Sequence, residues 1–285
     1  MIRQLMSAAL SLMALVVSGL VVSGLARPAA AQTANQSGDM ALERLDTADQ
    51  ARGWDAVGRL DLGLHGFCTG ALIAPDLVLT AAHCLFDKET GARIEPAQIK
   101  FLAGLRNGRA AAYRGVKHAI AHPEYVYGGE EALGRVAFDL ALIELDQPIR
   151  LPSIVPFATE GGPAKGDEVG VVSYAQDRAE APSLQEVCHV LARQPGVLVL
   201  SCNVDFGSSG APIFAFRDGV ARVVSVVSAK ADFEGQKVAL GTTLGTESDA
   251  PLGTLLAEMK TLSSPFQRPG EDGRDAAGGA KFLRP

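Results

Sequence analysis

Short apolar runs, separated by turn residues, recur along the chain between residues 57 and 243. The first half carries runs at residues 57–64, 70–73, 77–80, 99–103, 116–120 and 140–145. The second half carries runs at residues 168–174, 186–191, 197–202, 211–216, 220–228 and 238–243. Many short strands at this spacing are typical of an all-β sandwich or barrel, so we expect two all-β halves of similar size.

Two prolines mark the boundary between the halves. Residues 147–152 read Gln-Pro-Ile-Arg-Leu-Pro, and proline lacks the N–H that a strand ladder needs. We therefore expect one folded region at residues 54–152 and a second at residues 153–262. The second should end in a short helix, because apolar residues recur there at three- and four-residue steps, namely Leu252, Leu255, Leu256, Met259 and Leu262.

The first 31 residues have the pattern of a secretory signal peptide. Arg3 supplies a positive start, residues 8–25 are almost wholly apolar, and residues 29–31 form an Ala-Ala-Ala cleavage site. The alternative is a retained membrane anchor, because the apolar run is close to the length that spans a bilayer. The glycines, the cleavage motif and the polar stretch that follows favour removal. We expect an exported protein, periplasmic or extracellular, with no stable membrane association.

The mature chain begins and ends in polar segments. Residues 32–53 predict a flexible N-terminal arm, and residues 263–285, rich in proline, glycine and charge, predict a disordered tail. Removal of 31 of the 285 residues leaves 254, and the loss of Arg3 and Arg27 moves the net charge from −6 to −8. This acidic chain gives no reason to expect nucleic acid as a partner, and its 47% hydrophobic composition suffices for a core in a monomer.

Four cysteines lie in the mature part, at Cys68, Cys84, Cys188 and Cys202. An even number in an exported chain indicates disulfides, and three pairings are possible. We favour Cys68–Cys84 and Cys188–Cys202, because each pair flanks a short apolar segment that could fold back as a hairpin. A metal site has little support, since no C-x-x-C or His-x-His spacing occurs, and we expect no metal.

Three polar residues stand out among the apolar runs. His83 lies in Thr-Ala-Ala-His-Cys, Ser209 lies in Gly-Ser-Ser-Gly-Ala-Pro, and Asp139 lies among apolar residues, where an unpaired carboxylate would be costly. A serine hydroxyl is a weak nucleophile that needs a base to take its proton and a third group to orient that base. His83 and Asp139 suit these two roles. The glycine before the serines lets the N–H groups of Gly207 and Ser209 turn toward a developing oxyanion.

The blocks at residues 80–84, 139–142 and 207–212, with the stretch at 67–73, resemble the signature segments of trypsin-like (chymotrypsin-fold) serine proteases. The matches extend over roughly residues 54–262, in the order of the family. The resemblance implies two six-stranded antiparallel β-barrels with the active site between them, His83 and Asp139 coming from the first and Ser209 from the second. It implies a secreted serine endopeptidase of the bacterial type, acting on proteins or peptides through an acyl-enzyme with no cofactor. It also supports the Cys68–Cys84 bond.

Two other interpretations of these motifs compete with the trypsin-like one. An α/β-hydrolase carries G-x-S-x-G and the order serine, acid, histidine, whereas here Ala211 replaces the last glycine and the order is histidine, acid, serine. A catalytically inactive trypsin-like binding or regulatory protein is the main alternative, since a fold alone does not fix a function. Such proteins have usually lost a triad residue, and all three candidates are intact in this sequence.

The residue before the nucleophile departs from the digestive members of the family. They carry an aspartate there, which receives the new N-terminal amine after activation, whereas this chain has Ser208. A serine cannot form that ion pair, and no Arg-Ile-Val-Gly-Gly segment occurs upstream. We therefore expect a site that is competent without N-terminal insertion.

The sequence leaves three alternatives for the residue that the specificity pocket prefers at P1. Its candidate residues are Asn203, Asp205, Ser228 and Lys230. Asp205 at the floor would favour a basic P1 residue, Asn203 a neutral polar one, and Lys230 at the rim an acidic one. The resemblance also makes Ser228 the serine that supports the aspartate.

Overall fold

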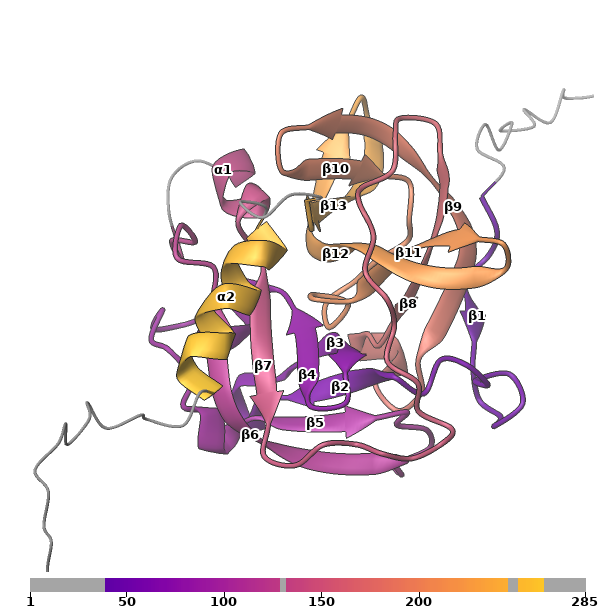
Figure 1. Cartoon of the computed structure of the whole chain (residues 1–285). Coiled ribbons are helices and arrows are strands. Elements are labelled where there is room, and N and C mark those ends of the chain that lie inside the picture. The colour runs from indigo at the N-terminus through magenta and orange to yellow at the C-terminus, as the bar shows by residue number, and fades with distance from the viewer. Residues whose placement is uncertain (1–38, 129–131, 246–250, 264–285) are drawn as a thin grey trace, which may run out of the picture. The chain divides into compact units, whose positions relative to one another are not determined.

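The first half of the chain forms a closed barrel with the strand order β2-β3-β4-β7-β6-β5 (Figure 1). Neighbouring strands are antiparallel, and β5 pairs with β2, so the sheet has no free edge. The strands are β2 (Val57–Asp61), β3 (Phe67–Ala74), β4 (Leu77–Thr80), β5 (Lys100–Ala103), β6 (Ala112–Ala121) and β7 (Ala141–Leu145).

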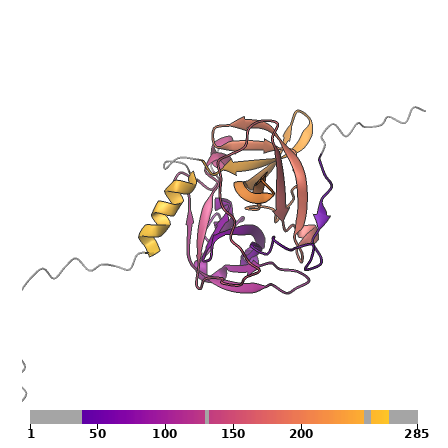
Figure 2. The same ribbon diagram turned by 45° about the vertical axis from the view of Figure 1, so that its right-hand side comes forward.

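The second half forms a second ring, with the strand order β9-β10-β13-β12-β11-β8 (Figure 2). Because β8 also pairs with β9, this sheet closes as well. The strands are β8 (Glu168–Ser173), β9 (Ser183–Gln194), β10 (Val197–Leu200), β11 (Pro212–Arg217), β12 (Val220–Phe233) and β13 (Gln236–Thr243). The predicted fold of two six-stranded antiparallel barrels is confirmed.

The computed structural model describes residues 39–128, 132–245 and 251–263. The chain divides into two units, Met1–Gln36 and Ser37–Pro285, and every described residue belongs to the second. The predicted signal peptide and residues 264–285 of the predicted tail lie outside the described residues. Within the described part, no helix is both long and apolar enough to cross a membrane.

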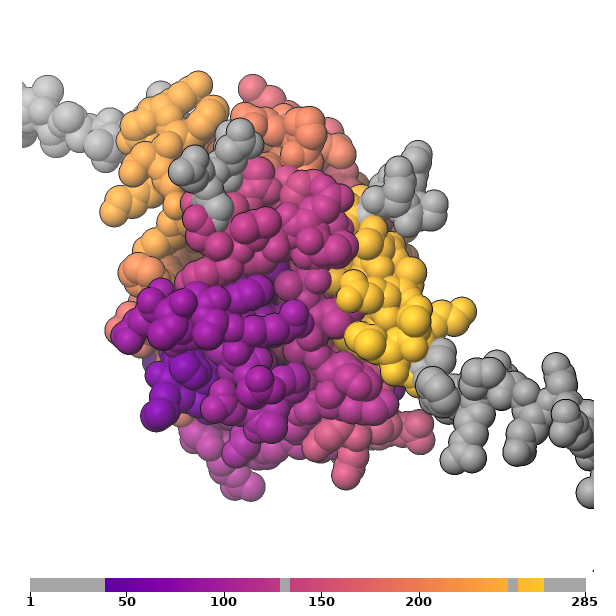
Figure 3. Space-filling view, turned by 90° about the vertical axis from the view of Figure 1, so that its left-hand side faces the viewer, coloured from indigo at the N-terminus to yellow at the C-terminus, as the bar shows by residue number. Residues whose placement is uncertain are grey.

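Helices are few in the part of the chain that the structure describes. Helix α2 (Pro251–Ser263) packs on β6 and β7 of the first barrel, as Figures 1 and 3 show. It buries Leu252, Leu255 and Met259, but Leu256 and Leu262 of the predicted stripe are 41% and 47% exposed. Helix α1 (Ala132–Ala137), which the sequence pattern did not predict, contacts β10 and β13. Short 3₁₀ turns are η1 (Gly63–His65), η2 (Ala82–Leu85), η3 (Pro96–Gln98) and η4 (Gln176–Arg178).

Residues 39–53 lie on the barrels, in contrast to the flexibility that their polar composition predicted. The short strand β1 (Glu43–Arg44) pairs with β9, and Leu45 and Ala51 are buried. Backbone hydrogen bonds and two buried apolar side chains are enough to hold a polar segment that has little structure of its own. Residues 32–38 of the predicted arm lie outside the described residues.

Aromatic side chains join the two barrels. The ring of Phe214 in β11 lies 5.1 Å from that of Trp54 and 4.7 Å from that of Phe157, in edge-to-face arrangements that favour aromatic pairs. Trp54 precedes the first strand of the first barrel, and Phe157 lies in the connection between the barrels. This contact fixes the barrels against each other, and the candidate site depends on that arrangement.

Candidate active site

His83 and Asp139 are hydrogen-bonded at the centre of the site. Nδ1 of His83 lies 2.7 Å from Oδ2 of Asp139, and the backbone N–H of His83 donates to Oδ1 at 2.8 Å. Ser228 of β12 donates from Oγ to Oδ2 at 2.5 Å, so this carboxylate has three donors. A carboxylate at Nδ1 places the proton of neutral His83 there and leaves Nε2 as a base.

Both residues are held by the segments next to them. His83 lies in η2, directly after β4, and the bond between Cys68 and Cys84 ties this turn to β3. The segment of Asp139 is held by Thr242 of β13, whose hydroxyl lies 2.6 Å from Val136 O and 3.2 Å from Asp139 O. The side chain of His83 is 19% exposed and that of Asp139 is 4% exposed, so water reaches the base more readily than the carboxylate.

Thr69 of β3 connects the first barrel to the loop that carries Ser209. Its N–H donates to Ser209 O and its Oγ1 donates to Gly207 O, each at 2.8 Å, and Thr69 is fully buried. Because Thr69 follows Cys68, these bonds bring the serine loop to the segment that bears His83. Among the described residues, the Oγ of Ser209 has no hydrogen-bond partner; such contacts often tighten only when substrate binds.

The serine loop has a shape that only glycine permits at two positions. Gly207 has φ +96°, and a Cβ there would overlap the ring of Phe67. Gly210 has φ +74°, and a Cβ there would overlap the hydroxyl of Thr80. Within the described chain, the N–H groups of Gly207 and Ser209 have no acceptor, whereas those of Ser208 and Gly210 donate to Asp205 O and Val227 O. Two neighbouring free donors of this kind are what an oxyanion hole requires.

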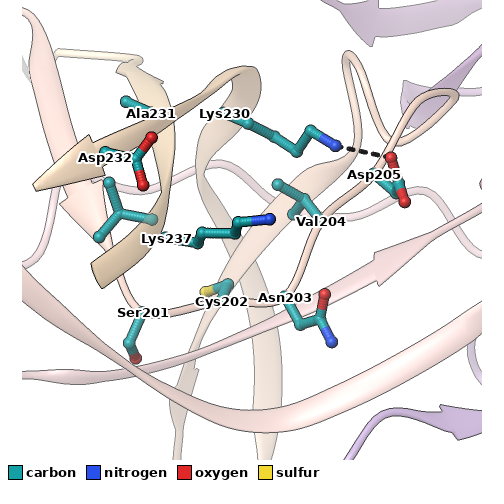
Figure 4. Close-up of a pocket in the computed structure, with 10 residues that line it drawn as sticks. Ser201, Cys202, Asn203, Val204, Asp205, Lys230, Ala231, Asp232 and Lys237 are labelled. Atoms are coloured by element: carbon teal, nitrogen blue, oxygen red, sulfur yellow. Dashed lines mark hydrogen bonds and ion pairs between the residues drawn. The ribbon is translucent and has the colours of Figure 1, made fainter. Parts of the chain in front are cut away.

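A pocket of about 640 Å³ opens beside the loop that precedes the serine (Figure 4). Three of the predicted specificity residues line it, namely Asn203, Asp205 and Lys230. Ser228 does not line it, because this side chain points to Asp139 and is buried. The other lining residues are Ser201, Cys202, Val204, Ala231, Asp232, Lys237 and Val238.

Charges in the pocket are only partly paired. Nζ of Lys230 lies 2.7 Å from Oδ1 of Asp205, and this contact, with the N–H of Phe206, lowers the pKa of Asp205 below its ordinary value. Lys237 extends into the pocket beside Lys230 (Figure 4). Within the described residues, Lys237 forms no ion pair or hydrogen bond.

The pocket wall is fixed from behind by Gln185 of β9. Its Oε1 accepts the N–H of Asn203 at 2.7 Å, and its Nε2 donates to Met40 O at 3.0 Å. The disulfide between Cys188 and Cys202 holds the same wall. Both predicted disulfides are therefore present, and one end of the second lines the pocket.

The described residues include one group of potential metal ligands, Cys68, His83 and Cys84. Both sulfurs are joined in a disulfide, so neither can serve as a thiolate ligand. The donor set does not fit a metal ion.

Four residues of the site had no sequence signal of their own: Thr69, Gln185, Lys237 and Arg178. Three of them act through a partner elsewhere in the chain, as Thr69 does with Ser209, whereas Lys237 lines the pocket without an ion pair or hydrogen bond among the described residues. Short-range patterns carry no information on such pairs.

Comparison with known proteins identifies the family of this chain. The family model of the trypsin-like peptidase domain matches residues 68–224, more than half of the chain. A glutamyl endopeptidase of Bacillus licheniformis is 26% identical over 150 residues, which are 52% of this chain and 45% of that protein. Human mannan-binding lectin serine protease 1 is 30% identical over 120 residues, which are 38% of this chain and 16% of that protein. The chain thus spans less than half the length of these two relatives.

A solved structure gives the same result for the fold. A Glu endopeptidase in complex with MPD matches with a TM-score of 0.59 and 16% identity, covering 79% of this chain and 97% of that one. At this identity the likeness concerns the fold alone, and the family follows from the domain match. The chain belongs to the trypsin-like peptidase family.

Proposed function

We propose that the protein is an exported serine endopeptidase that cleaves peptide bonds through an acyl-enzyme intermediate. Ser209 attacks the scissile carbonyl, His83 takes the proton of its hydroxyl and passes it to the leaving amine, and Asp139 orients His83. The N–H groups of Gly207 and Ser209 stabilise the oxyanion. The observation that carries the proposal is the carboxylate of Asp139, buried and bonded to His83 and Ser228.

Peptide hydrolysis by the purified protein tests this function. Ser209→Ala should lower kcat by about 10⁶-fold while the fold is retained, because the nucleophile acts as one unit with its base. A wild-type protein that binds peptides but never cleaves them would contradict the proposal and favour an inactive binding protein.

Export is part of the proposal and rests on the signal-peptide pattern of residues 1–31 and on the two disulfides. Activity without N-terminal insertion is a second part. It is supported by Ser208, a buried residue whose hydroxyl lies within hydrogen-bond distance of four groups of the protein, none of them an N-terminal amine.

The pocket supports an acidic P1 residue. Asp205, the basis for a basic P1 residue, is paired with Lys230, whereas the ammonium of Lys237 is unpaired within the described residues and extends into the pocket (Figure 4). The side-chain amide of Asn203 adds a donor at the wall. Asp232 is the opposing charge in the lining; it stands across the β12–β13 ladder from Lys237. The name of the glutamyl endopeptidase relative agrees with this preference.

Two lysines lie near the ring of Phe206, the residue that follows Asp205. The exposed ring of Phe206 has Nζ of Lys230 4.6 Å from its centroid and Nζ of Lys88 6.0 Å from it. Lys88 comes from the first barrel, so ammonium groups from both barrels meet at this ring. Because Lys230 is already paired with Asp205, Lys88 supplies the added positive charge near this ring, which would favour an acidic substrate over a basic one.

Matched substrates that differ only at P1 test the preference. Lys237→Gln should lower kcat/KM for a P1 glutamate by about tenfold and leave a P1 glutamine substrate within about twofold, because one charge pair is lost. Lys165→Gln, an exposed change outside the pocket, is the control. A wild-type preference for P1 lysine would refute this part while leaving the endopeptidase in place.

A further inference from the structure

Arg178 is a buried cation behind the serine loop. It ends η4, in the segment that follows β8, and is 7% exposed. Its Nη1 lies 3.0 Å from Oδ1 of Asp177, and its Nη2 lies 3.2 Å from Ser173 Oγ and 3.4 Å from Ser208 Oγ. Its Nε is buried and, within the described chain, has no partner. Arg178 is therefore incompletely satisfied in the fold.

Burial of such a group is unfavourable. Burial lowers the pKa of Arg178 from its ordinary value, and the nearby carboxylates of Asp177 and Asp205 oppose this shift. The guanidinium stays charged all the same, as arginine does in proteins. Asp177, its ion-pair partner, is 70% exposed and compensates the charge weakly. An apolar side chain of similar volume would often stabilise the fold as well or better. The charge is thus better explained by function than by stability.

Ser208, which Arg178 contacts, is fully buried and lies between the two candidate oxyanion donors. Its Oγ accepts the N–H of Asp205 at 3.2 Å and lies 3.2 Å from both Tyr174 O and Ser173 Oγ. A hydroxyl has one proton to donate and two lone pairs to accept with. Donation to Tyr174 O and acceptance from Asp205 and Arg178 use all of this capacity. The side chain of Ser208 then has one orientation.

The backbone of Ser208 joins the N–H of Gly207 to that of Ser209. A change in φ or ψ of Ser208 turns the N–H of Ser209 relative to that of Gly207, and Gly207, which has no Cβ and a φ of +96°, can follow such a change with little steric resistance. Thr69 holds the carbonyls of Gly207 and Ser209 from the side of the first barrel, and the contacts of the Ser208 side chain hold the loop from the side of the second barrel. The orientation of the donors therefore depends in part on what holds the side chain of Ser208.

We propose that Arg178 is a positioning residue for the oxyanion hole, which fixes Ser208 from inside the protein so that the N–H groups of Gly207 and Ser209 converge on one oxygen. This inference rests on the proposed function and extends it. The buried guanidinium takes the place of an inserted N-terminal amine. Because it acts where negative charge develops, it should raise kcat and leave ground-state binding unchanged.

The experiment compares two inhibitors on purified wild-type protein, Arg178→Met, Arg178→Lys and Ser208→Ala. A peptide boronic acid adds to the serine hydroxyl and places an oxygen in the oxyanion hole. A reduced-amide peptide of the same sequence occupies the same subsites with no carbonyl. Arg106→Met is the matched control, since Arg106 is also partly buried and is paired with a carboxylate, Asp55, that is not part of the serine loop.

We expect Arg178→Met to lower kcat and boronate affinity together, by about 10- to 100-fold, because a whole oxyanion donor is worth about 10²- to 10³-fold. Reduced-amide affinity should stay within about twofold, and Arg178→Lys should recover part of the loss. Arg106→Met should change thermal stability but leave kcat, boronate affinity and reduced-amide affinity unchanged. If Arg178→Met shows no thermal transition, Arg178→Lys and Ser208→Ala must show the same selective loss.

Full kcat in Arg178→Met, or equal losses of boronate and reduced-amide affinity in these variants, would overturn the inference. These outcomes can be distinguished from the outcome expected if the proposed function itself is wrong. In that case the wild type itself would neither cleave peptides nor bind the boronate.

Discussion

Ser228 of the second barrel donates a hydrogen bond to Asp139 of the first, with 2.5 Å between Oγ and Oδ2. The same oxygen lies 2.7 Å from Nδ1 of His83. The orientation of the base thus depends on a residue from each barrel, and the interface between the barrels is part of the site.

Ser228→Ala should lower kcat by about tenfold with little change in KM. The variant leaves Asp139 buried with one donor fewer, and a hydrogen bond to a charged group is worth about 1.5–3 kcal/mol. Steady-state kinetics with one peptide substrate measures this. Ser225→Ala is the control, because that buried hydroxyl on the same strand donates to Thr242 O. Equal losses in the two variants would assign the effect to packing.

Gly207→Ala should abolish most activity and destabilise the fold. The new Cβ would overlap the ring of Phe67 at a φ of +96°, so the loop must move and carry the oxyanion donors with it. Gly219→Ala has a similar positive φ of +75° with nothing within 4 Å, and should cost only about 1 kcal/mol from strain. Thermal unfolding and kcat, measured for both variants, separate the effect of backbone strain at a positive φ from the effect of steric overlap with Phe67. An active Gly207→Ala protein would speak against the loop conformation.

Gln185→Leu should raise KM more than it lowers kcat. The change leaves the N–H of Asn203 without its acceptor and frees Met40 O, so the pocket wall and residues 39–53 loosen together. KM for pocket-filling substrates should rise about five- to tenfold. Susceptibility of residues 39–53 to an added protease is the second measurement. An unchanged KM with a released N-terminal segment would show that the two are not coupled.

Acid should weaken the attachment of α2 through Glu144. Burial opposes ionisation of Glu144, but hydrogen bonds from His118, Ser263 and Lys117 outweigh it and lower its pKa from 4.5 to about 2. A carboxyl with a depressed folded-state pKa stabilises the fold above its unfolded value and loses that effect as the pH falls. Glu144→Gln should therefore lower Tm at neutral pH, and its difference from the wild type should shrink below pH 4.5 and vanish near pH 2.

Thermal melts across this pH range check the prediction, with the exposed Glu186→Gln as control. A Tm difference that stayed constant down to the lowest pH would mean that the ionised form of Glu144 does not contribute.

Much of the fold was readable from short-range pattern. Each of the twelve strands of the two barrels coincides with an apolar run, because strand and core face follow from local alternation and turn residues. Leu256 and Leu262 show the limit. Their spacing fits the helix stripe, but which part of the stripe is covered depends on β6 and β7, which precede it by more than a hundred residues.

The site residues also fall into those that short sequence motifs predict and those that depend on tertiary contacts. His83, Asp139 and Ser209 were recognisable because their neighbours form compact motifs. Thr69 was not, because its contact with the serine loop exists only after the barrels have packed together. Arg178 was not either, because it meets Ser208, 30 residues away, only once the second barrel has folded. The sequence left Asp205 and Lys230 as competing charges for P1, because their pairing across 25 residues is visible only in the structure, and the proposed preference for an acidic P1 residue rests on that pairing.

Labelling with a fluorophosphonate probe, followed by mass spectrometry of the modified peptide, tests the central claim most directly. The account predicts one adduct, on Ser209 and not on the adjacent Ser208, which fragmentation of the peptide distinguishes. Ser209→Ala should give no adduct, and His83→Ala should react at least about a hundredfold more slowly, because the hydroxyl loses its base. An adduct elsewhere, or equal labelling of His83→Ala and the wild type, would contradict the assignment of Ser209 as a nucleophile activated by His83.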